Sequence, residues 1–204
     1  MSEKKTKKIA ISVGVVGQIS AGKGELVRYL TEKLGFSSFS LSTVVHNELN
    51  KKRISKFTRT MLQDEGDKLR RRYGDDILAK RIFRVIKEQK KDMFVIEGIR
   101  NPAEIKFFKK NKNFILIGVK ANRKIRFARL LSRNRVWDPK TYGDFLKVDQ
   151  RDLGLEQGKS GQQVGKCLLY CDYILTNNDS LENFEKKLEK LFIHKLFPSQ
   201  FVGK

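Results

Sequence analysis

A glycine- and lysine-containing segment directly after an apolar run constrains the fold of this chain more than any other feature. Residues 17–23 read GQISAGK, and the run Ile9–Val16 precedes them. Two glycines separated by four residues and followed by lysine, at the exit of a strand, are typical of a phosphate-binding loop. The glycines let successive N–H groups point inward, and the lysine adds a mobile positive charge. We therefore predict a strand, this loop, and a helix over Glu25–Leu34 whose N-terminus faces the same anion.

The end of this loop departs from the usual pattern. Gly24 stands where Ser or Thr commonly offers its hydroxyl to Mg²⁺, so a metal would rely on water and on carboxylates. An accidental glycine-rich turn is the alternative interpretation, and the flanking strand and helix argue against it. We expect the whole segment to bind a nucleotide: Gly17, Gln18, Ile19, Ser20, Ala21, Gly22, Lys23, Gly24 and Glu25.

Length and composition indicate a single soluble domain. The 204 residues suffice for one substantial core, and no run of eighteen apolar residues occurs. Because the charged start Met1–Lys8 lacks a following apolar signal region, we expect a cytoplasmic protein that binds no membrane. Cys167 and Cys171 lie four apart in an apolar helical pattern and are predicted to be reduced core thiols.

The net charge of +21 is the most unusual bulk property. A basic surface attracts phosphate polymers, but the lysines are spread along the whole chain rather than grouped. We therefore expect non-specific nucleic-acid binding at low salt and no dedicated nucleic-acid face. No feature of the sequence specifies an oligomeric state.

Five short β-type runs separated by helical patterns predict an α/β fold. They are Ile9–Val16, Phe39–Leu41, Met93–Glu97, Asn113–Val119 and Tyr173–Thr176. This alternation is typical of a five-stranded parallel sheet with helices on both faces. The helix before the third strand is expected to bury Leu78, Ile82, Val85 and Ile86, and the last helix to span Leu181–Leu196.

Two polar stretches do not read as core. Residues 42–74 are helical, and residues 133–165 are rich in Gly, Asp, Arg and Gln. Long insertions in a compact domain are usually lids or substrate-binding elements. We predict one domain over residues 1–204, with a basic tail at 1–8, an acceptor-binding arm at 42–74 and a lid region at 133–165.

A second site is predicted where the third strand ends. Glu97 would lie at the carboxyl edge of the sheet, where ligands bind in open α/β folds, and could orient Mg²⁺ or its waters. Arg100 follows and can grip an acceptor phosphate with two hydrogen bonds. The alternative is a strand that ends in solvated charged residues.

Arginines downstream of the fourth strand suit the stabilisation of a phosphoryl group. Arg126, Arg129 and Arg133 fall at i, i+3 and i+7, so they share one helix face. The residues expected to pack away from that face are Ile125, Ala128 and Leu131. Phosphoryl transfer spreads negative charge over three oxygens, which makes Arg129 and Arg133 catalytic candidates. A solvated basic face is the alternative.

The lid region offers one further catalytic candidate, Arg151. It lies between Asp149 and Asp152 and could approach a phosphate from the closing side. A mutual ion-pair cluster of the three residues at the surface is the alternative interpretation.

Together these residues resemble the P-loop nucleoside monophosphate kinase superfamily, with the nearest likeness to dephospho-coenzyme A kinase-like and deoxynucleotide kinase-like members. Gly24 after Lys23 is similar to the loop ending of adenylate kinases. The landmarks run in order along nearly the whole chain: Gly17–Glu25, Ser40–Ser42, Leu62, Gln63, Gly66, Leu69, Arg70, Glu97–Arg100, Arg126, Phe127, Arg129, Arg151, Asp152, Gly161–Gln163, Cys167, Asp172–Ile174, Asn177 and Asn178.

The resemblance implies ATP as donor, Mg²⁺ as cofactor, a P-loop fold with five parallel strands, and a mobile lid that carries arginines. It assigns Arg100 to the acceptor phosphate, and Asn177 and Asn178 to the donor base. The acceptor arm would contact its ligand through Ser42, His46, Arg59, Gln63 and Arg70. The chain departs from the family at Glu97, where adenylate kinases have Asp, at Ile99, where Pro is usual, and at His46, where many relatives have an Arg that Arg59 could replace.

Three functions remain open, and the acceptor chemistry separates two of them. A hydroxyl acceptor, as in dephospho-coenzyme A, benefits from a carboxylate that takes its proton, whereas a monophosphate needs none. No carboxylate follows the second strand until Glu48, although Asp64 or Asp67 could approach. The sequence thus favours a kinase of (deoxy)nucleoside monophosphates over a dephospho-coenzyme A kinase. The third function is a nucleic-acid-associated P-loop ATPase without a small acceptor.

Overall fold

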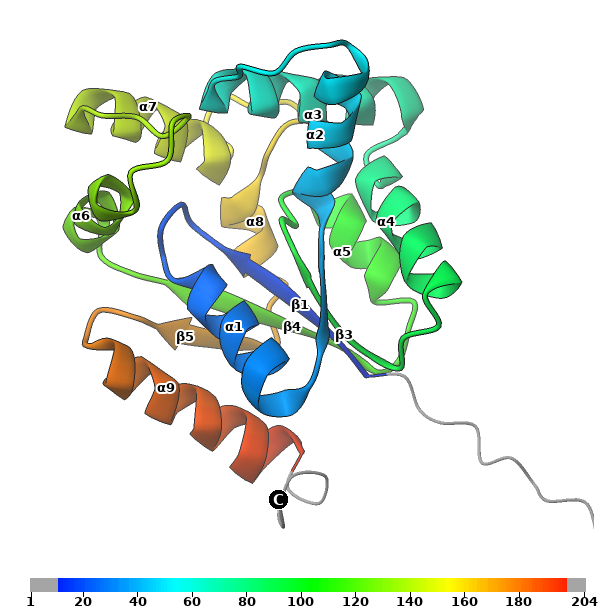
Figure 1. Cartoon of the computed structure of the whole chain (residues 1–204), viewed down its shortest axis with the longest axis vertical. Helices are drawn as coiled ribbons and strands as arrows, with labels where there is room; N and C mark the ends of the chain where they lie inside the picture. Colours follow the sequence, from blue (N-terminus) through cyan, green and yellow to red (C-terminus); the bar gives the residue numbers. More distant parts are fainter. Residues whose placement is uncertain (1–10, 198–204) are drawn as a thin grey trace, which may run out of the picture.

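The computed structural model describes residues 11–197 and has a five-stranded parallel sheet at its centre, as predicted (Figure 1). The strands lie in the order β2-β3-β1-β4-β5. Their bounds are β1 Ile11–Gly17, β2 Ser37–Ser40, β3 Met93–Glu97, β4 Phe114–Lys120 and β5 Tyr173–Thr176. The predicted basic tail at 1–8 and the first two residues of the predicted first strand lie outside the described residues.

Helices connect the strands and cover both faces of the sheet (Figure 1). Their bounds are α1 Lys23–Leu34, α2 Leu41–Lys51, α3 Arg59–Tyr73, α4 Ile77–Glu88, α5 Pro102–Phe108, α6 Arg123–Arg133, α7 Tyr142–Leu153, α8 Val164–Leu168 and α9 Leu181–Glu189. The predicted last helix continues beyond α9 as a π-helical segment, η1, over Lys190–Leu196. Within residues 11–197 no helix combines the length and apolarity that a membrane span requires.

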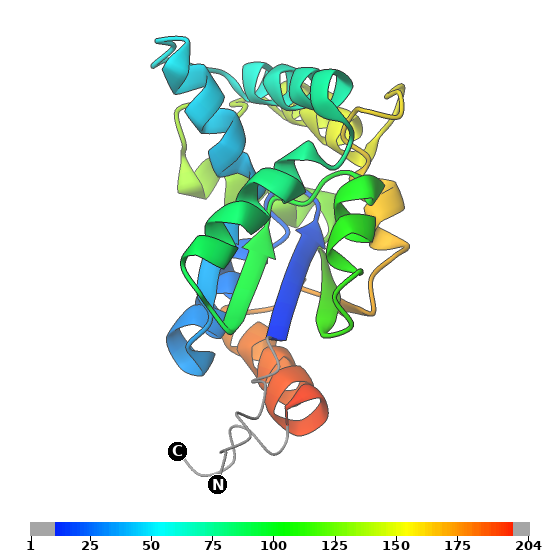
Figure 2. The same ribbon diagram turned by 90° about the vertical axis from the view of Figure 1, so that its right-hand side faces the viewer.

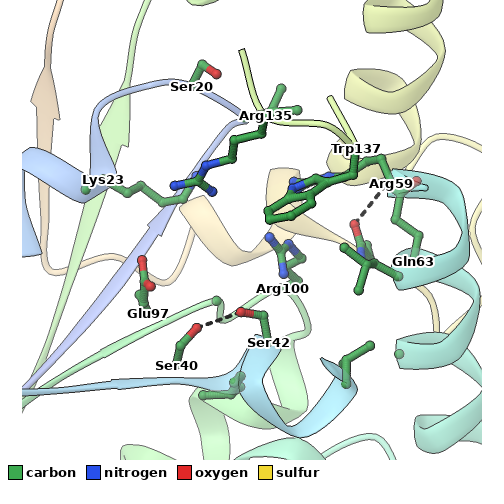
Figure 3. A pocket seen from close by; sticks show the side chains of 18 of the residues that line it. Ser20, Lys23, Ser40, Ser42, Arg59, Gln63, Glu97, Arg100, Arg135 and Trp137 are labelled. Atoms are coloured by element: carbon green, nitrogen blue, oxygen red, sulfur yellow. Dashed lines mark hydrogen bonds between the residues drawn. The ribbon is translucent and has the colours of Figure 1, made fainter. Parts of the chain in front are cut away.

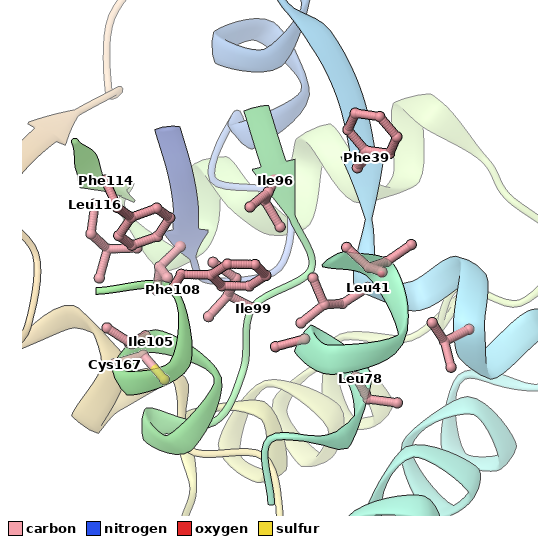
Figure 4. Packing of buried hydrophobic residues seen from close by; sticks show 14 of the residues in the cluster. Phe39, Leu41, Leu78, Ile96, Ile99, Ile105, Phe108, Phe114, Leu116 and Cys167 are labelled. Atoms are coloured by element: carbon pink, nitrogen blue, oxygen red, sulfur yellow. The ribbon is translucent and has the colours of Figure 1, made fainter. Parts of the chain in front are cut away.

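The core has two halves because side chains alternate between the faces of a strand. Along β3, Phe94 and Ile96 point into one half and Val95 into the other. Helices α2, α4, α5 and α8 close the first half, which Figure 4 shows around Ile96 and Phe108. Helices α1 and α9 close the second half.

The carboxyl ends of the strands meet at one edge, where the inserted helices gather. The register pairs Gly17 with Val119 and Ser40 with Glu97, so the loops after β1, β2, β3 and β4 start side by side. Figure 2 shows the strand arrows pointing toward the end of the molecule that carries α2 and α3. Ligands bind at this edge in open parallel sheets.

Several sequence-based expectations need correction. Leu41 begins α2 rather than ending a strand, since the extended Ser40 is the residue before the helix. In α4, Leu78, Ile82 and Ile86 are buried as predicted, whereas Val85 is 38% exposed and Ala79 is buried instead. The stretch 42–74 contributes to the core through Val44 and Val45, which pack inside the first half.

The predicted faces of α6 are also wrong. Arg126 and Leu130 are buried, whereas Ala128 is exposed and Leu131 is 42% exposed. Arg126 is the reason, because its guanidinium is drawn inward by ion pairing and takes the position expected for an apolar side chain.

The two cysteines are free, as expected of reduced thiols. Cys167 is buried in α8, while Cys171 follows the helix and is half-buried. Burial, the larger cause, raises the pKa of the Cys171 thiol to about 12, and burial raises that of Cys167 as well. Burial thus favours the protonated form of both thiols.

Candidate active site

A cavity of about 620 Å³ opens at the carboxyl edge of the sheet (Figure 3). Its walls come from the loop after β1, the start of α2, the helix α3, the end of β3 and the segment that follows α6. A volume of this size is in the range of small-molecule sites. The cavity joins the two regions that the sequence assigned separately to a donor and an acceptor.

The glycines of the loop after β1 are required by close contacts. Gly22 has a φ of +105°, and a Cβ on it would lie 2.1 Å from Nδ2 of Asn177. A Cβ on Gly17 would lie 2.3 Å from the carbonyl oxygen of Val119. Any side chain at these positions would displace the loop from the strands that support it.

The bare backbone of this loop leaves room for an anion, and one polar atom in it has no partner. The Ser20 hydroxyl is buried, and no described residue hydrogen bonds to it. Ser20 also has a φ of 57°, which is uncommon for a residue other than glycine. A strained residue with an orphaned hydroxyl is the arrangement expected where a bound group supplies the missing partner. The loop thus fits the phosphate groups of a ligand.

Lys23 is held inside the cavity without a carboxylate partner. Its Nζ donates to the carbonyl oxygens of Gly17 and Gln18, at 2.6 and 2.7 Å. Burial lowers the pKa of Lys23 to about 7, with Arg100 and Arg59 lowering it further and Asp152 and Glu97 opposing them. A polyanion that enters the cavity would favour the charged ammonium.

Nucleotide binding is therefore expected to take up a proton near Lys23. The unfolded chain holds this proton up to a pH of about 10.5 and the folded chain only to about 7, so stability rises with pH across that window. At about pH 8 a bound triphosphate should restore the charge, with uptake of close to one proton. Calorimetric titration in buffers of different ionisation enthalpy measures this number, and Lys23→Met should abolish it. Uptake that persists in Lys23→Met would assign the proton to another group.

Two arginines face the opposite part of the cavity from the loop. Nε of Arg100 donates to Oδ1 of Asp152 at 3.2 Å. Arg59 has no hydrogen bond or ion pair to any residue within 11–197, and burial, followed by the charge of Arg100, lowers its pKa to about 10. Asp152 pairs with Arg100, and no carboxylate of the described residues pairs with Arg59, so this part of the cavity has an excess of positive charge.

The structure brings most of the predicted site residues to this one cavity. Those that line it are Ile19, Ser20, Gly22, Lys23, Gly24, Glu25, Ser42, His46, Arg59, Gln63, Arg70, Glu97, Arg100, Arg129, Arg133 and Asn177. The Ser42 hydroxyl lies 2.8 Å from that of Ser40. Burial, then the charges of Arg100 and Arg59, lower the pKa of His46, which favours its neutral form.

Other predicted residues do not reach the cavity with a free group. Arg151 does not line it, because its Nη2 donates to Asp64 and Asp67 at 2.6 and 3.0 Å. Asn178 also lies outside the lining, and its Oδ1 accepts from the backbone of Asn122. Gly17, Gln18 and Ala21 shape the loop from behind.

The guanidinium of Arg70 is engaged by carboxylates although the residue lines the cavity. It donates to Glu104 at 2.9 and 3.0 Å and to Asp67 at 3.2 Å, and all three side chains are buried. Glu104 in turn accepts from the backbone N–H of Arg100 at 2.8 Å. Arg70 therefore braces the chain at Arg100 rather than offering a free guanidinium to a ligand.

The cluster of Asp149, Arg151 and Asp152, the alternative to a catalytic Arg151, is not formed either. Asp149 pairs with Arg126 at 2.6 and 2.8 Å, and Asp152 pairs with Arg100. The reason is helical geometry: Asp149 and Asp152 lie two and one positions from Arg151 on α7, and side chains at these spacings do not face each other, so each finds its partner on another element.

Arg126 and Arg129 tie the loop after β1, the predicted donor loop, to its surroundings. Nη1 of Arg126 donates to the carbonyl of Ile19 at 3.2 Å, and its pair with Asp149 links this loop to α7. Arg129 donates to the backbone oxygen and Oδ1 of Asn177, whose Nδ2 donates to the carbonyl of Ala21 at 3.1 Å. Loop, α6, α7 and the residue after β5 thus form one hydrogen-bonded unit.

Sequence reasoning missed several lining residues: Trp137, Arg135, Gln162 and Leu181. Gln162 lies in the segment Gly161–Gln163, which is one of the landmarks of the resemblance, but the resemblance assigned no role to it. Trp137 is the chain's one tryptophan and lies in the predicted lid region, but the sequence does not show that it faces the cavity.

The metal prediction concerns Glu97, which is half-buried and lines the cavity. In the described part of the chain no three His, Cys, Asp or Glu side chains gather as a metal site. Mg²⁺ in phosphate-transfer sites is held by one or two carboxylates together with substrate phosphates and water. Glu97 fits that arrangement as a single carboxylate.

The fold and the loop define a P-loop kinase-like protein. The family model AAA_17, described as an AAA domain, matches residues 16–143. A UPF0200 protein of Methanothermobacter thermautotrophicus is 31% identical over 185 residues, covering 89% of this chain and 88% of that protein. The chain belongs to this AAA-domain family and to the UPF0200 proteins.

Solved structures agree with this fold. The chain superposes on TT1252 from Thermus thermophilus with a TM-score of 0.58 at 17% identity, covering 92% of this chain and 99% of that one. A shikimate kinase from Acinetobacter baumannii in complex with shikimate gives 0.54 at 16% identity, covering 94% and 98%.

Proposed function

We propose that this protein is an ATP-dependent phosphotransferase that acts on a small acceptor already carrying a phosphate, of the (deoxy)nucleoside monophosphate class. ATP would supply the γ-phosphoryl group, with Mg²⁺ to neutralise its charge. The observation that carries the proposal is Arg59, an unpartnered guanidinium beside Arg100 on the side of the cavity away from the donor loop. Two guanidiniums suit a dianionic phosphate better than a neutral hydroxyl compound.

The positions of the carboxylates also favour a phosphate acceptor over a hydroxyl. Among the described residues, Glu25 and Glu97 are the carboxylates that line the cavity. Asp64 and Asp67, which could have served as a base, are held by Arg151. A hydroxyl acceptor would therefore have to rely on Glu97, the group that best suits the metal.

In the proposed reaction the side chains and backbone amides of the cavity would position the two substrates and neutralise the charge of their phosphates. The amides after Gly17, with Lys23 and Ser20, would hold the donor phosphates, and Asn177 would lie at the donor's other end. Arg100, fixed by Asp152, and Arg59 would hold the acceptor phosphate in line with the donor. Such transfer depends mainly on positioning and electrostatic stabilisation.

We also propose that residues 42–74 are the acceptor arm and that residues 133–165 close over the site. Arg129 and Arg133 lie on the helix that leads into the latter segment, and Arg133 is paired with Asp138 at 2.7 and 2.9 Å. These arginines would approach the transferred group when the segment closes.

The first test measures ADP formed from ATP and Mg²⁺ with each nucleoside monophosphate, ribose or deoxyribose, and with dephospho-coenzyme A. Acceptor-dependent ADP with a monophosphate supports the proposal. ADP with dephospho-coenzyme A alone contradicts it in favour of a hydroxyl acceptor. ADP without acceptor, or only after RNA is added, contradicts it in favour of an ATPase.

Arg59→Ala is expected to raise the KM for the acceptor while leaving the KM for ATP near that of the wild type. Loss of a charge-assisted hydrogen bond to phosphate corresponds to about 10- to 100-fold in kcat/KM for the acceptor. The matched control is Arg53→Ala, an exposed arginine before α3 that does not line the cavity. A change confined to the KM for ATP would move Arg59 to the donor side.

A further inference from the structure

Two glutamines present free hydrogen-bonding groups to the cavity. Gln63 and Gln162 are 2% and 5% exposed, and both line the cavity. Nε2 of Gln63 donates to Oε1 of Gln162 at 3.1 Å. Oε1 of Gln63 and Nε2 of Gln162 have no hydrogen bond to any residue in the described range 11–197. Neither atom belongs to the fully buried, unpartnered side-chain atoms of the described residues, which are Ser20 Oγ and Arg151 Nε, so both are accessible from the cavity. A ligand that enters the cavity can therefore pair with them in place of water.

The free groups of this pair are one acceptor and one donor that lie close together. The edge of a nucleobase presents the complementary combination, either an amino group beside a ring nitrogen or a carbonyl beside a ring N–H. If both amides turn over, the free acceptor and donor change places while the bond between the glutamines is kept. The pair can thus match bases of either pattern, whereas a sugar phosphate has no such edge.

An aromatic side chain lies beside the amide pair. Trp137 lines the cavity, and its indole N–H donates to no described residue. Its ring is supported by Phe57 at 5.5 Å and His46 at 6.1 Å between ring centroids. The guanidinium of the exposed Arg135 lies over the indole, 5.9 Å from the ring centroid. A planar ligand group that stacks on the indole can take the place of this guanidinium.

These groups lie on the acceptor side of the cavity. Figure 3 shows Trp137, Gln63 and Arg59 grouped together, with Arg100 beneath the indole and Lys23 at the opposite end. A ligand with its phosphate at Arg100 would therefore carry its remaining atoms toward Trp137 and Gln63. Base stacking on an aromatic ring with hydrogen bonds to the base edge is a common way to bind a single nucleotide.

We propose that Trp137, Gln63 and Gln162 form a base-binding subsite, so that the acceptor must carry an aromatic base. The inference rests on the proposed function, because it places the base of the same acceptor whose phosphate meets Arg59 and Arg100. It adds that the base, and not the phosphate alone, selects the substrate.

Trp137 provides a direct readout, since it is the only tryptophan in the chain. Titration of the full-length protein with AMP, GMP, CMP and UMP, without ATP, is expected to change the intrinsic tryptophan fluorescence to saturation for at least one of them. Ribose 5-phosphate, which has the phosphate and sugar but no base, should bind at least about tenfold more weakly in calorimetry. Equal binding of ribose 5-phosphate would overturn the proposal.

Variants separate stacking from hydrogen bonding. Trp137→Leu is expected to lower nucleotide affinity by about tenfold or more, and Trp137→Phe to retain most of it. Gln162→Met should weaken nucleotide binding but not ribose 5-phosphate binding, while Gln150→Met, on the exposed side of α7, serves as the matched control. ATP affinity and thermal midpoints check that each variant folds. Unchanged nucleotide affinity in both Trp137→Leu and Gln162→Met would overturn the proposal.

The experiments distinguish a wrong base-binding subsite from a wrong phosphotransferase activity. If ribose 5-phosphate is phosphorylated as well as the nucleotides, the phosphotransferase stands and the base subsite is wrong. If no acceptor yields ADP, the phosphotransferase is wrong. In that case, nucleotide binding that depends on Trp137 and Gln162 would still support the subsite.

Discussion

Lys23→Ala is expected to fold normally and to lose nearly all turnover. Loss of one preorganised group that stabilises transferred charge typically costs about 3–4 kcal/mol of barrier, or roughly 10²–10³ in rate. The fold should tolerate the change, because the Lys23 side chain has two backbone contacts and no carboxylate partner among the described residues. Initial rates of ADP release at saturating substrates measure the effect, and a thermal melt measures folding.

Lys33→Ala is the matched control, since this lysine lies in the last turn of the same helix and is exposed. It should keep wild-type turnover. Wild-type turnover in Lys23→Ala would remove the donor loop from the proposed mechanism. Equal losses in the two variants would point to a general effect on α1.

Arg126→Met is expected to destabilise the protein by about 3–5 kcal/mol, the usual cost of leaving one member of a buried ion pair alone. Arg126 and Asp149 are each 1% exposed and joined by two short hydrogen bonds. The variant would leave the Asp149 carboxylate with only the half-exposed Arg123, 3.7 Å away, and would also leave the carbonyls of Ile19 and Ala121 without this donor. The free energy of unfolding from urea titration measures the loss.

The double variant Arg126→Met with Asp149→Leu should recover most of that stability, because no unpaired charge remains. As a control, Lys186→Met breaks the pair with Glu182, in which the side chains are 67% and 76% exposed, and should cost about 1 kcal/mol or less. A loss below about 1 kcal/mol in Arg126→Met would show that the pair contributes little. If the double variant is as unstable as Arg126→Met, the loss of stability comes from packing and not from the unpaired charge.

The sheet was predictable because its signals are local. Apolar runs such as Met93–Glu97 and glycines such as Gly22 carry their structural meaning within a few residues. The second strand was misplaced by about two residues, because the polar serines of Ser37–Ser40 conceal an edge strand. Boundaries of this kind depend on neighbouring strands rather than on the segment itself.

The position of a residue at the cavity was predictable where its motif is local, as for Lys23 and Arg100. Arginines with several possible partners were not. Arg151 and Arg126 find carboxylates 84 and 23 residues away, and the separations in the sequence give no indication of these pairs. Trp137 and Gln162 were missed for the same reason, because a cavity wall is assembled from segments that only the fold brings together.

The hydrogen bond from Asn177 to Ala21 has a consequence for biosynthesis. The two residues are 156 positions apart, so a ribosome produces the glycine-rich loop long before the amide that braces it. Since domains form from the N-terminal end during translation, a nascent chain can pair β1 with β3 and β4 while this loop still lacks its brace. Capture of the nucleotide in its final geometry thus waits for β5, and early fragments would bind it poorly even where their strands have already assembled.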